Sequence, residues 1–171
     1  SSVRAGTGLI GGKFAMDVRL SRVLSDGFID RASSNLKSFY LSGSYVGRKS
    51  LIKAVAFSGK ERTYQSWYGT PESVINGDAD EMNAYADRNY LSDAERANLL
   101  ESGRSYNYYT YQDEVDNYQQ DNYQLHFTHT FSPKTTLSFA GHYTKGRGYY
   151  EQYKLGKYIS YYWFINLIVG G

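Results

Sequence analysis

Apolar and polar residues alternate along positions 13–21 of the chain. One set of alternate positions holds Phe14, Met16, Val18 and Leu20. The other set holds Lys13, Ala15, Asp17, Arg19 and Ser21. Because successive side chains of a β-strand point to opposite faces of the sheet, this pattern predicts a strand from about Thr7 to Val23 with one apolar and one polar face.

The same two-residue period recurs further along the chain. It predicts strands over residues 37–46, 51–64 and 122–131, and another from residue 137 onward. Residues 51–57 alternate less clearly, so the pattern does not assign their faces. Residues 1–5 carry no strong strand signal.

The connections between these predicted strands alternate between long and short. Residues 25–35 and 67–120 are long, whereas 47–50 and 132–135 are short turns. Short turns on one side and long loops on the other are typical of outer-membrane β-barrels, whose tilted strands cross the bilayer in about nine to eleven residues. We therefore expect an all-β fold: an antiparallel transmembrane β-barrel segment of about five or six strands with long extracellular loops.

The long loop at 67–120 contains a predicted short helix. Ser92 and Glu95 have the spacing of a capping box, in which each residue satisfies a free backbone N–H of the other at a helix start. Gly103 stands where the end of that helix favours a left-handed residue. The helix agrees with a loop that packs on itself, since structureless loops beyond about 12–15 residues are uncommon.

Composition and charge restrict the function classes. The chain has 19 Tyr and 17 Gly, and an excess of tyrosine suits membrane interfaces, sugar-binding faces and recognition surfaces. No apolar run reaches the roughly eighteen residues that a transmembrane helix needs. The net charge of +2 arises from dispersed residues without a basic block, so we expect no nucleic-acid partner.

No pattern in the chain points to catalysis or to a cofactor. Cysteine is absent, which excludes disulfides and thiolate metal sites. His126 and His129 would lie on opposite faces of one strand, whereas His126 and His142 would share the polar face of neighbouring strands, where we expect them to fill space rather than bind metal. No nucleophile elbow, P-loop or dinucleotide motif is present. We expect no enzyme, no catalytic residue, no metal and no cofactor.

Three stretches of the sequence are similar to a known family. They are residues 8–31, which begin Gly8-Leu-Ile-Gly-Gly-Lys-Phe-Ala-Met16, together with Tyr64-Gln-Ser-Trp-Tyr-Gly-Thr-Pro-Glu72 and Gly146-Arg-Gly-Tyr-Tyr-Glu-Gln-Tyr153. These stretches closely resemble the barrel of TonB-dependent outer-membrane receptors. The resemblance extends over about residues 6–154 and fades from Leu155 onward.

The resemblance implies a fold, a location and a set of partners. Members of this family have a barrel of about 22 strands filled by an N-terminal plug domain, and they import scarce nutrients such as metal chelates or cobalamin with energy delivered through TonB. This sequence shows no candidate plug and no TonB box, so residues 1–171 are expected to be part of such a barrel in the bacterial outer membrane. The implied partners are outer-membrane lipid, the remainder of the receptor with its plug, TonB through that plug, and a small nutrient ligand.

Residues 155–171 are apolar on both faces and differ from the family pattern. We expect either a further strand with an aromatic belt at Tyr161, Tyr162 and Trp163 or a more distant part of the protein. The chain ends on Gly170-Gly171, whereas a complete barrel of this kind usually ends on an aromatic residue, and this favours an incomplete barrel.

Aromatic residues of the long loop form the candidate ligand surface. They are Trp67, Tyr68, Tyr106, Tyr108, Tyr109 and Tyr111. Their rings suit stacking on a chelate, a corrin or a sugar, and the competing interpretation is an aromatic girdle with loop self-packing. The alternative function is a small autonomous outer-membrane barrel or a soluble carbohydrate-binding β-protein, which aromatic content and chain length support.

Overall fold

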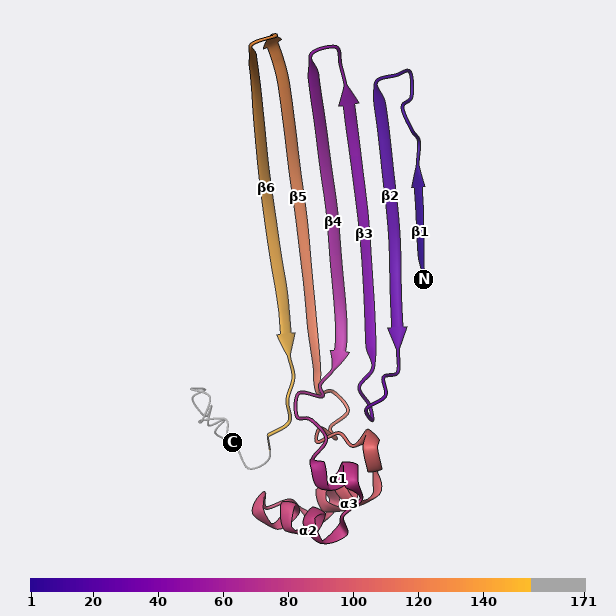
Figure 1. The fold of residues 1–171 in the computed structure, drawn as a ribbon, viewed down its shortest axis with the longest axis vertical. Helices are drawn as coiled ribbons and strands as arrows, with labels where there is room; N and C mark the ends of the chain where they lie inside the picture. The colour runs from indigo at the N-terminus through magenta and orange to yellow at the C-terminus, as the bar shows by residue number, and fades with distance from the viewer. Residues whose placement is uncertain (155–171) are drawn as a thin grey trace, which may run out of the picture.

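In the computed structural model, which describes residues 1–154, one antiparallel sheet carries a helical segment at one end (Figure 1). Each strand pairs with the next along the chain, in the order β1 to β6. The strands are β1 (Ser2–Gly6), β2 (Phe14–Ser25), β3 (Ser34–Val46), β4 (Ser50–Tyr64), β5 (Val115–Ser132) and β6 (Thr135–Tyr150). The helices, all between β4 and β5, are α1 (Glu72–Asn76), α2 (Ala79–Arg88), α3 (Asp93–Glu101) and the 3₁₀ helix η1 (Gly103–Ser105).

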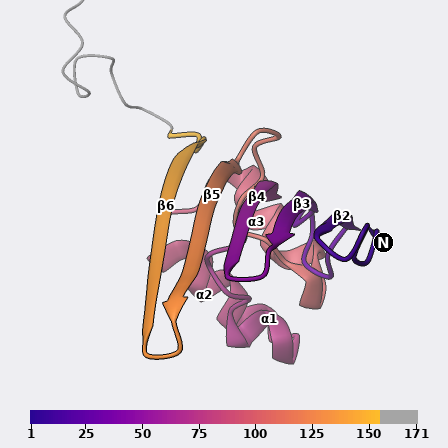
Figure 2. The ribbon, with the colours of Figure 1, turned by 90° about the horizontal axis from the view of Figure 1, so that it is seen from above.

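The register places most apolar positions of the strands on one face of the sheet, although Val55 and Phe57 of β4 lie on the other face. Val18 pairs with Leu41, Leu41 with Ala56, Ala56 with Tyr123, and Tyr123 with Tyr143. We call this side the apolar face, and it confirms the alternation in 13–21. No described element covers it, since Phe14, Leu125 and Phe139 are 55%, 47% and 58% exposed. Viewed from above, the strands form a single layer (Figure 2).

The opposite side, which we call the polar face, carries charged and hydroxyl side chains. Here Arg4 of β1 donates from Nε and Nη2 to the Asp17 carboxylate of β2, at 3.0 and 2.8 Å. The register also assigns residues 51–57, whose pattern was unclear. Ile52 pairs with Tyr45 on the apolar face, whereas Lys53 pairs with Ser44 on the polar face.

The N-terminal residues differ from the sequence-based prediction in two ways. Residues 2–6, which carry no clear strand pattern, form β1 because the edge of β2 offers them an unpaired hydrogen-bonding row. Residues 7–13, which were predicted to begin the long strand, form a turn instead. Gly11 and Gly12 adopt positive φ values of 56° and 68° there, a conformation that glycine tolerates and a strand excludes.

Loops and turns are segregated to opposite ends of the sheet. Residues 26–33 and the long loop lie at the end that carries the helices, and the turns at 47–49 and 133–134 lie at the other end (Figure 1). This arrangement confirms the predicted alternation. The long loop spans 65–114 rather than 67–120, because 115–120 already pair with β4. Four of the six residues 115–120 are polar, so apolar alternation did not reveal that extension.

The helical segment of the long loop has its own small core. Val74, Met82, Ala86, Leu99 and Tyr106 are buried together. The capping box of Ser92 and Glu95 is present, and Gly103 adopts a φ of 58°, as predicted. Helices α1 and α2 were not predicted. Asp78 caps the start of α2, since its side chain accepts from the Glu81 amide.

Within residues 1–154 no helix has the length and apolar character needed to cross a membrane. The sheet over the same residues is open, with β1 and β6 at its two edges. The predicted strand or distant segment at 155–171 lies outside the described residues.

Candidate ligand surface

Asn107 joins the two loops at the helical end of the sheet. Its side chain is fully buried, and its Nδ2 donates to the Asp30 and Gln65 carbonyls at 2.8 and 3.0 Å. Its Oδ1 accepts from the Tyr109 amide at 3.1 Å. One side chain therefore ties residues 26–33, the end of β4 and the aromatic segment 106–111 together.

Arg31 reinforces this junction from the shorter loop. It donates from Nε to the Tyr109 carbonyl at 2.9 Å and from Nη2 to the Asn107 carbonyl at 3.1 Å. Its backbone has a φ of 66°, which few non-glycine residues adopt. These charge-assisted bonds offset the cost of that conformation, and they hold the backbone of the aromatic segment in place.

Four of the predicted aromatic residues form one cluster on this framework. Tyr109 is 2% exposed and lies at its centre. Its ring stacks on Tyr68 at 5.6 Å between centroids, and it meets Trp67 and Tyr108 edge to face at 6.3 and 5.5 Å. Trp67 and Tyr68 are 62% and 60% exposed, so their outer surfaces are open to contact a ligand.

The structure places the other two predicted residues apart from this cluster. Tyr106 is 2% exposed within the core of the helical segment, where burial raises the pKa of its hydroxyl to about 12. This position supports a packing role, and we leave Tyr106 out of the candidate surface. Tyr111 stacks on Tyr153 at 5.4 Å, and its backbone carbonyl accepts from the Tyr64 hydroxyl at 2.5 Å.

Burial also acts on the phenols inside the cluster. It raises the pKa of Tyr108 and of Tyr109, and the negative charge of Glu95 adds to the effect at Tyr108. Both hydroxyl groups therefore stay protonated at neutral pH. The cluster presents neutral rings with hydroxyl donors rather than phenolates.

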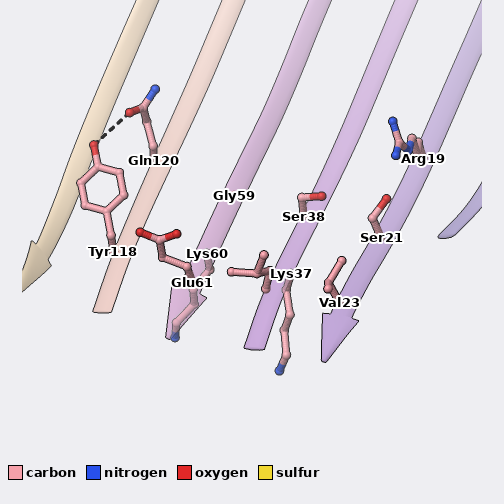
Figure 3. Close-up of a pocket in the computed structure, with 11 residues that line it drawn as sticks. Arg19, Ser21, Val23, Lys37, Ser38, Gly59, Lys60, Glu61, Tyr118 and Gln120 are labelled. Atoms are coloured by element: carbon pink, nitrogen blue, oxygen red, sulfur yellow. Dashed lines mark hydrogen bonds between the residues drawn. The ribbon is translucent and has the colours of Figure 1, made fainter. Parts of the chain in front are cut away.

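The polar face of the sheet carries a hollow in addition to this cluster. Tyr150, at the end of β6, lies on the polar face, and its ring is 6.0 Å from that of Trp67. Further along the strands the sheet has a hollow of about 410 Å³, shown in Figure 3. Its lining includes Arg19, Ser38, Glu61, Tyr118 and Gln120. The aromatic cluster and the hollow are separate features, and Tyr150 brings a polar-face residue of β6 close to the cluster.

Two glycines of β6 make room for an aromatic ring in this hollow. A Cβ at Gly146 would lie 2.7 Å from the Tyr118 hydroxyl, and one at Gly148 would lie 2.8 Å from its ring. Tyr118 therefore lies against the neighbouring strand, and its hydroxyl donates to Gln120 at 2.9 Å (Figure 3). Glycine is therefore required at both 146 and 148, because a larger side chain at either position would collide with Tyr118.

One solved structure resembles this fold. It is the open form of the ferric-catecholate import receptor Fiu from E. coli K12, a TonB-dependent receptor, with a TM-score of 0.59 and 15% sequence identity. The match covers 86% of this chain and 23% of the receptor, so the chain spans under a quarter of that protein's length. No protein-family model and no curated protein sequence matches the chain.

The likeness to the Fiu receptor concerns the fold alone and agrees with the expected receptor-like sheet.

The histidines lie as the alternation predicted. His129 is on the apolar face, where Nδ1 lies 2.7 Å from the Ser50 hydroxyl, and His126 and His142 are on the polar face of β5 and β6. Among residues 1–154 no three His, Cys, Asp or Glu side chains are grouped closely enough to hold a metal ion.

Sequence reasoning missed the residues that position the cluster. Asn107 lies between Tyr106 and Tyr108 and reads as one more polar loop residue, and Arg31 lies far away in the chain. One feature of the sequence points to Asn107: it lies within the Tyr-rich run. An amide side chain there can both donate to and accept from backbone groups. Tyr118 and Tyr150 were missed because their strand extensions were not predicted.

Proposed function

We propose that this chain is a wall segment of a TonB-dependent outer-membrane receptor that binds and imports a scarce nutrient. The observation that supports this most is the long antiparallel sheet whose uncovered apolar face opposes a polar face, with its long loops at one end. A lipid bilayer would cover the apolar face, and the polar face would line the lumen of a barrel. The fold likeness to a ferric-catecholate import receptor supports the same function.

The ligand in this proposal is a small aromatic or metal-chelate nutrient that first meets the exposed rings of Trp67 and Tyr68. A catecholate chelate presents flat rings, which suit stacking on Trp and Tyr. The hollow behind the cluster, with Arg19 at its lining, offers a cation to an anionic chelate. Tyrosine loses little rotamer freedom on binding, so these rings make efficient contacts.

The remaining roles follow from this proposal. The chain takes no part in catalysis and holds no cofactor of its own. Its partners are outer-membrane lipid, the rest of the same receptor including a plug domain, and TonB, which would act through that plug. Uptake of labelled ferric chelates by cells that carry the full-length protein, with and without TonB, tests the function. TonB-independent uptake, or none for any chelate or corrin offered, would contradict it.

We expect the exposed aromatic residues to contribute directly to ligand affinity. Replacement of Trp67 or Tyr68 by alanine in the full-length receptor should weaken binding of its ligand by about 1–3 kcal/mol, since each removes a large apolar contact. Titration of the purified receptor with ferric chelates measures this effect. Tyr90→Ala is the matched control, because Tyr90 is 93% exposed in the same loop but outside the cluster. If W67A and Y68A bind the ligand with unchanged affinity, these rings serve only to pack the loop.

The orientation of the sheet gives a further prediction. If the helical segment faces the cell exterior, trypsin added to intact cells should cleave after Arg88, whose side chain is 62% exposed, and spare Lys134 in the turn at the opposite end. Mass spectrometry of the fragments measures both sites. Cells with a permeabilised outer membrane serve as the control, in which Lys134 becomes accessible. Cleavage at Lys134 in intact cells would reverse the orientation.

A further inference from the structure

The acidic residues of the long loop outnumber its basic residues. Positions 65–114 hold ten Asp and Glu and three Arg, a net charge of −7, whereas the whole chain has a net charge of +2. Two of these arginines are paired within the loop, Arg88 with Glu81 and Arg96 with Asp87. The segment that carries the aromatic cluster therefore has an electrostatic field that attracts cations and repels anions.

The polar face of the sheet is also acidic near the loops. On this face Arg19 pairs with Tyr40, and the positions of β2 to β6 between that row and the loops hold no basic residue. The charged residues at these positions are Glu61 and Asp116. Basic side chains of the same end, such as Lys60, lie on the apolar face instead. The register thus separates acidic from basic residues between the two faces at the loop end.

Two carboxylates neighbour the aromatic cluster. At Tyr108, burial raises the pKa of the hydroxyl, and the negative charge of Glu95 raises it further. At Tyr150, whose ring lies 6.0 Å from that of Trp67, the directly paired residue of β5 on the same face is Asp116. Glu95 and Asp116 form no ion pair with any described residue, so the charge of each remains available to a ligand.

The exposed rings of the cluster suit an organic cation. Trp67, Tyr68 and Tyr108 are 62%, 60% and 36% exposed. The π face of Trp or Tyr attracts an ammonium or a guanidinium group, because the ring quadrupole places negative charge on that face. Arg31, the cation of the loop junction, donates instead to the backbone carbonyl of Tyr109. Open aromatic faces and nearby carboxylates therefore favour the same kind of ligand group.

We propose that the ligand carries an organic cation, an ammonium or guanidinium group, that binds on the rings of Trp67, Tyr68 and Tyr108. The inference rests on the proposed function and narrows its ligand class to metal chelates with an amine or guanidine beside the chelating group. A purely anionic chelate gains no such contact and is repelled by the net charge of the loop. An anionic chelating group is still accommodated, because Arg19 lies on the polar face beyond the acidic positions.

Ferric trihydroxamate chelates that differ only at one terminal group test the proposal. One form has a free ammonium group, the second has this amine acetylated, and the third has it succinylated, so that the group is positive, neutral or negative. Titration of the purified full-length protein should give about tenfold tighter binding of the ammonium form than of the acetylated form. The succinylated form should bind more weakly than both. Trp67→Leu, which keeps an apolar side chain but removes the ring, should lower the preference for the ammonium form about fivefold.

A matched pair of substitutions in α3 tests the role of the carboxylate. Glu95→Gln should lower the preference for the ammonium form about threefold. The capping box survives this change, because a glutamine at this helix position can also accept from the Ser92 amide. Glu101→Gln removes the same charge from the same helix, where the side chain is exposed and unpaired among the described residues, and it should leave the preference unchanged. Equal hydrogen exchange of α3 in both variants shows that the helix remains folded.

The outcomes separate this inference from the proposed function. Equal binding of the three chelates, tightest binding of the succinylated form, or binding of none of them overturns the inference. An equal loss of preference in E95Q and E101Q also overturns it, because the charge would then act without a contact at the cluster. TonB-dependent uptake of a purely anionic chelate, together with equal binding of the three forms, overturns the inference and leaves the proposed function standing. Preference for the ammonium form without TonB-dependent uptake supports the cation site and contradicts the proposed function.

Discussion

Arginine in place of Leu125 is expected to lower the free energy of unfolding in lipid by about 2–4 kcal/mol, the cost of a cationic side chain at the bilayer midplane on the lipid-facing side of a barrel. Leu125 pairs with Ala54 and Gly141 in the middle of the apolar face, and no described residue covers it. Denaturant unfolding of the full-length protein in lipid vesicles, followed by the mobility of its folded form on gels, measures the change.

Two matched substitutions test whether the cost at Leu125 comes from a lipid bilayer. Gln124→Arg places the same side chain one residue away on the polar face, and it should change stability by no more than about 0.5 kcal/mol. Leu137→Arg lies on the apolar face at its turn-side edge, and there the cost should fall to about 0–1 kcal/mol. Equal costs at Leu125 and Leu137 would contradict a bilayer, because a covering protein layer penalises both positions without regard to depth.

Alanine in place of Asn107 is expected to detach the two loops from each other at a cost of at least about 3 kcal/mol. The substitution leaves the Asp30 and Gln65 carbonyls and the Tyr109 amide without their partner, and each unpaired buried group costs about 1–3 kcal/mol. The sheet should remain folded, because none of its ladder bonds is lost. Hydrogen exchange should therefore rise in residues 26–33 and 65–114 and stay unchanged in β2 to β5.

Asn89→Ala provides the control within the same loop. The Asn89 side chain is exposed, and its Nδ2 donates only to the carbonyl of Tyr85 one helical turn earlier. Its loss should change exchange near the end of α2 alone. A similar exchange pattern in N107A and N89A would show that Asn107 does not join the loops.

The aromatic surface depends on the same junction. Because Arg31 and Asn107 hold the backbone of Tyr109, the N107A variant should also bind ligand more weakly although Trp67 and Tyr68 are intact. The loop is ordered without any ligand, so under the proposed function less conformational entropy would be lost on binding.

Several features of this protein follow from local sequence alone. The two faces of β2 and β5 are predictable because side chains of a strand alternate with a period of two, whatever the strand pairs with. The capping box at Ser92 and the left-handed Gly103 are equally local, since each depends on backbone groups within a few residues. The placement of long loops and short turns at opposite ends follows from connecting neighbouring antiparallel strands in order.

Only the tertiary structure decided the features that depend on residues far apart in the chain. Pairing assigned Ile52 and Lys53 to their faces, made β1 a strand and extended β5 back to Val115, because a ladder hydrogen bond needs a partner strand that no local pattern specifies. Docking of the loops through Asn107 separated the buried Tyr106 from the exposed Tyr68, although both are tyrosines of one loop. In the same way, the register alone places Arg22, Lys37, Lys60 and Arg147, which are scattered in the sequence, in one line across the apolar face.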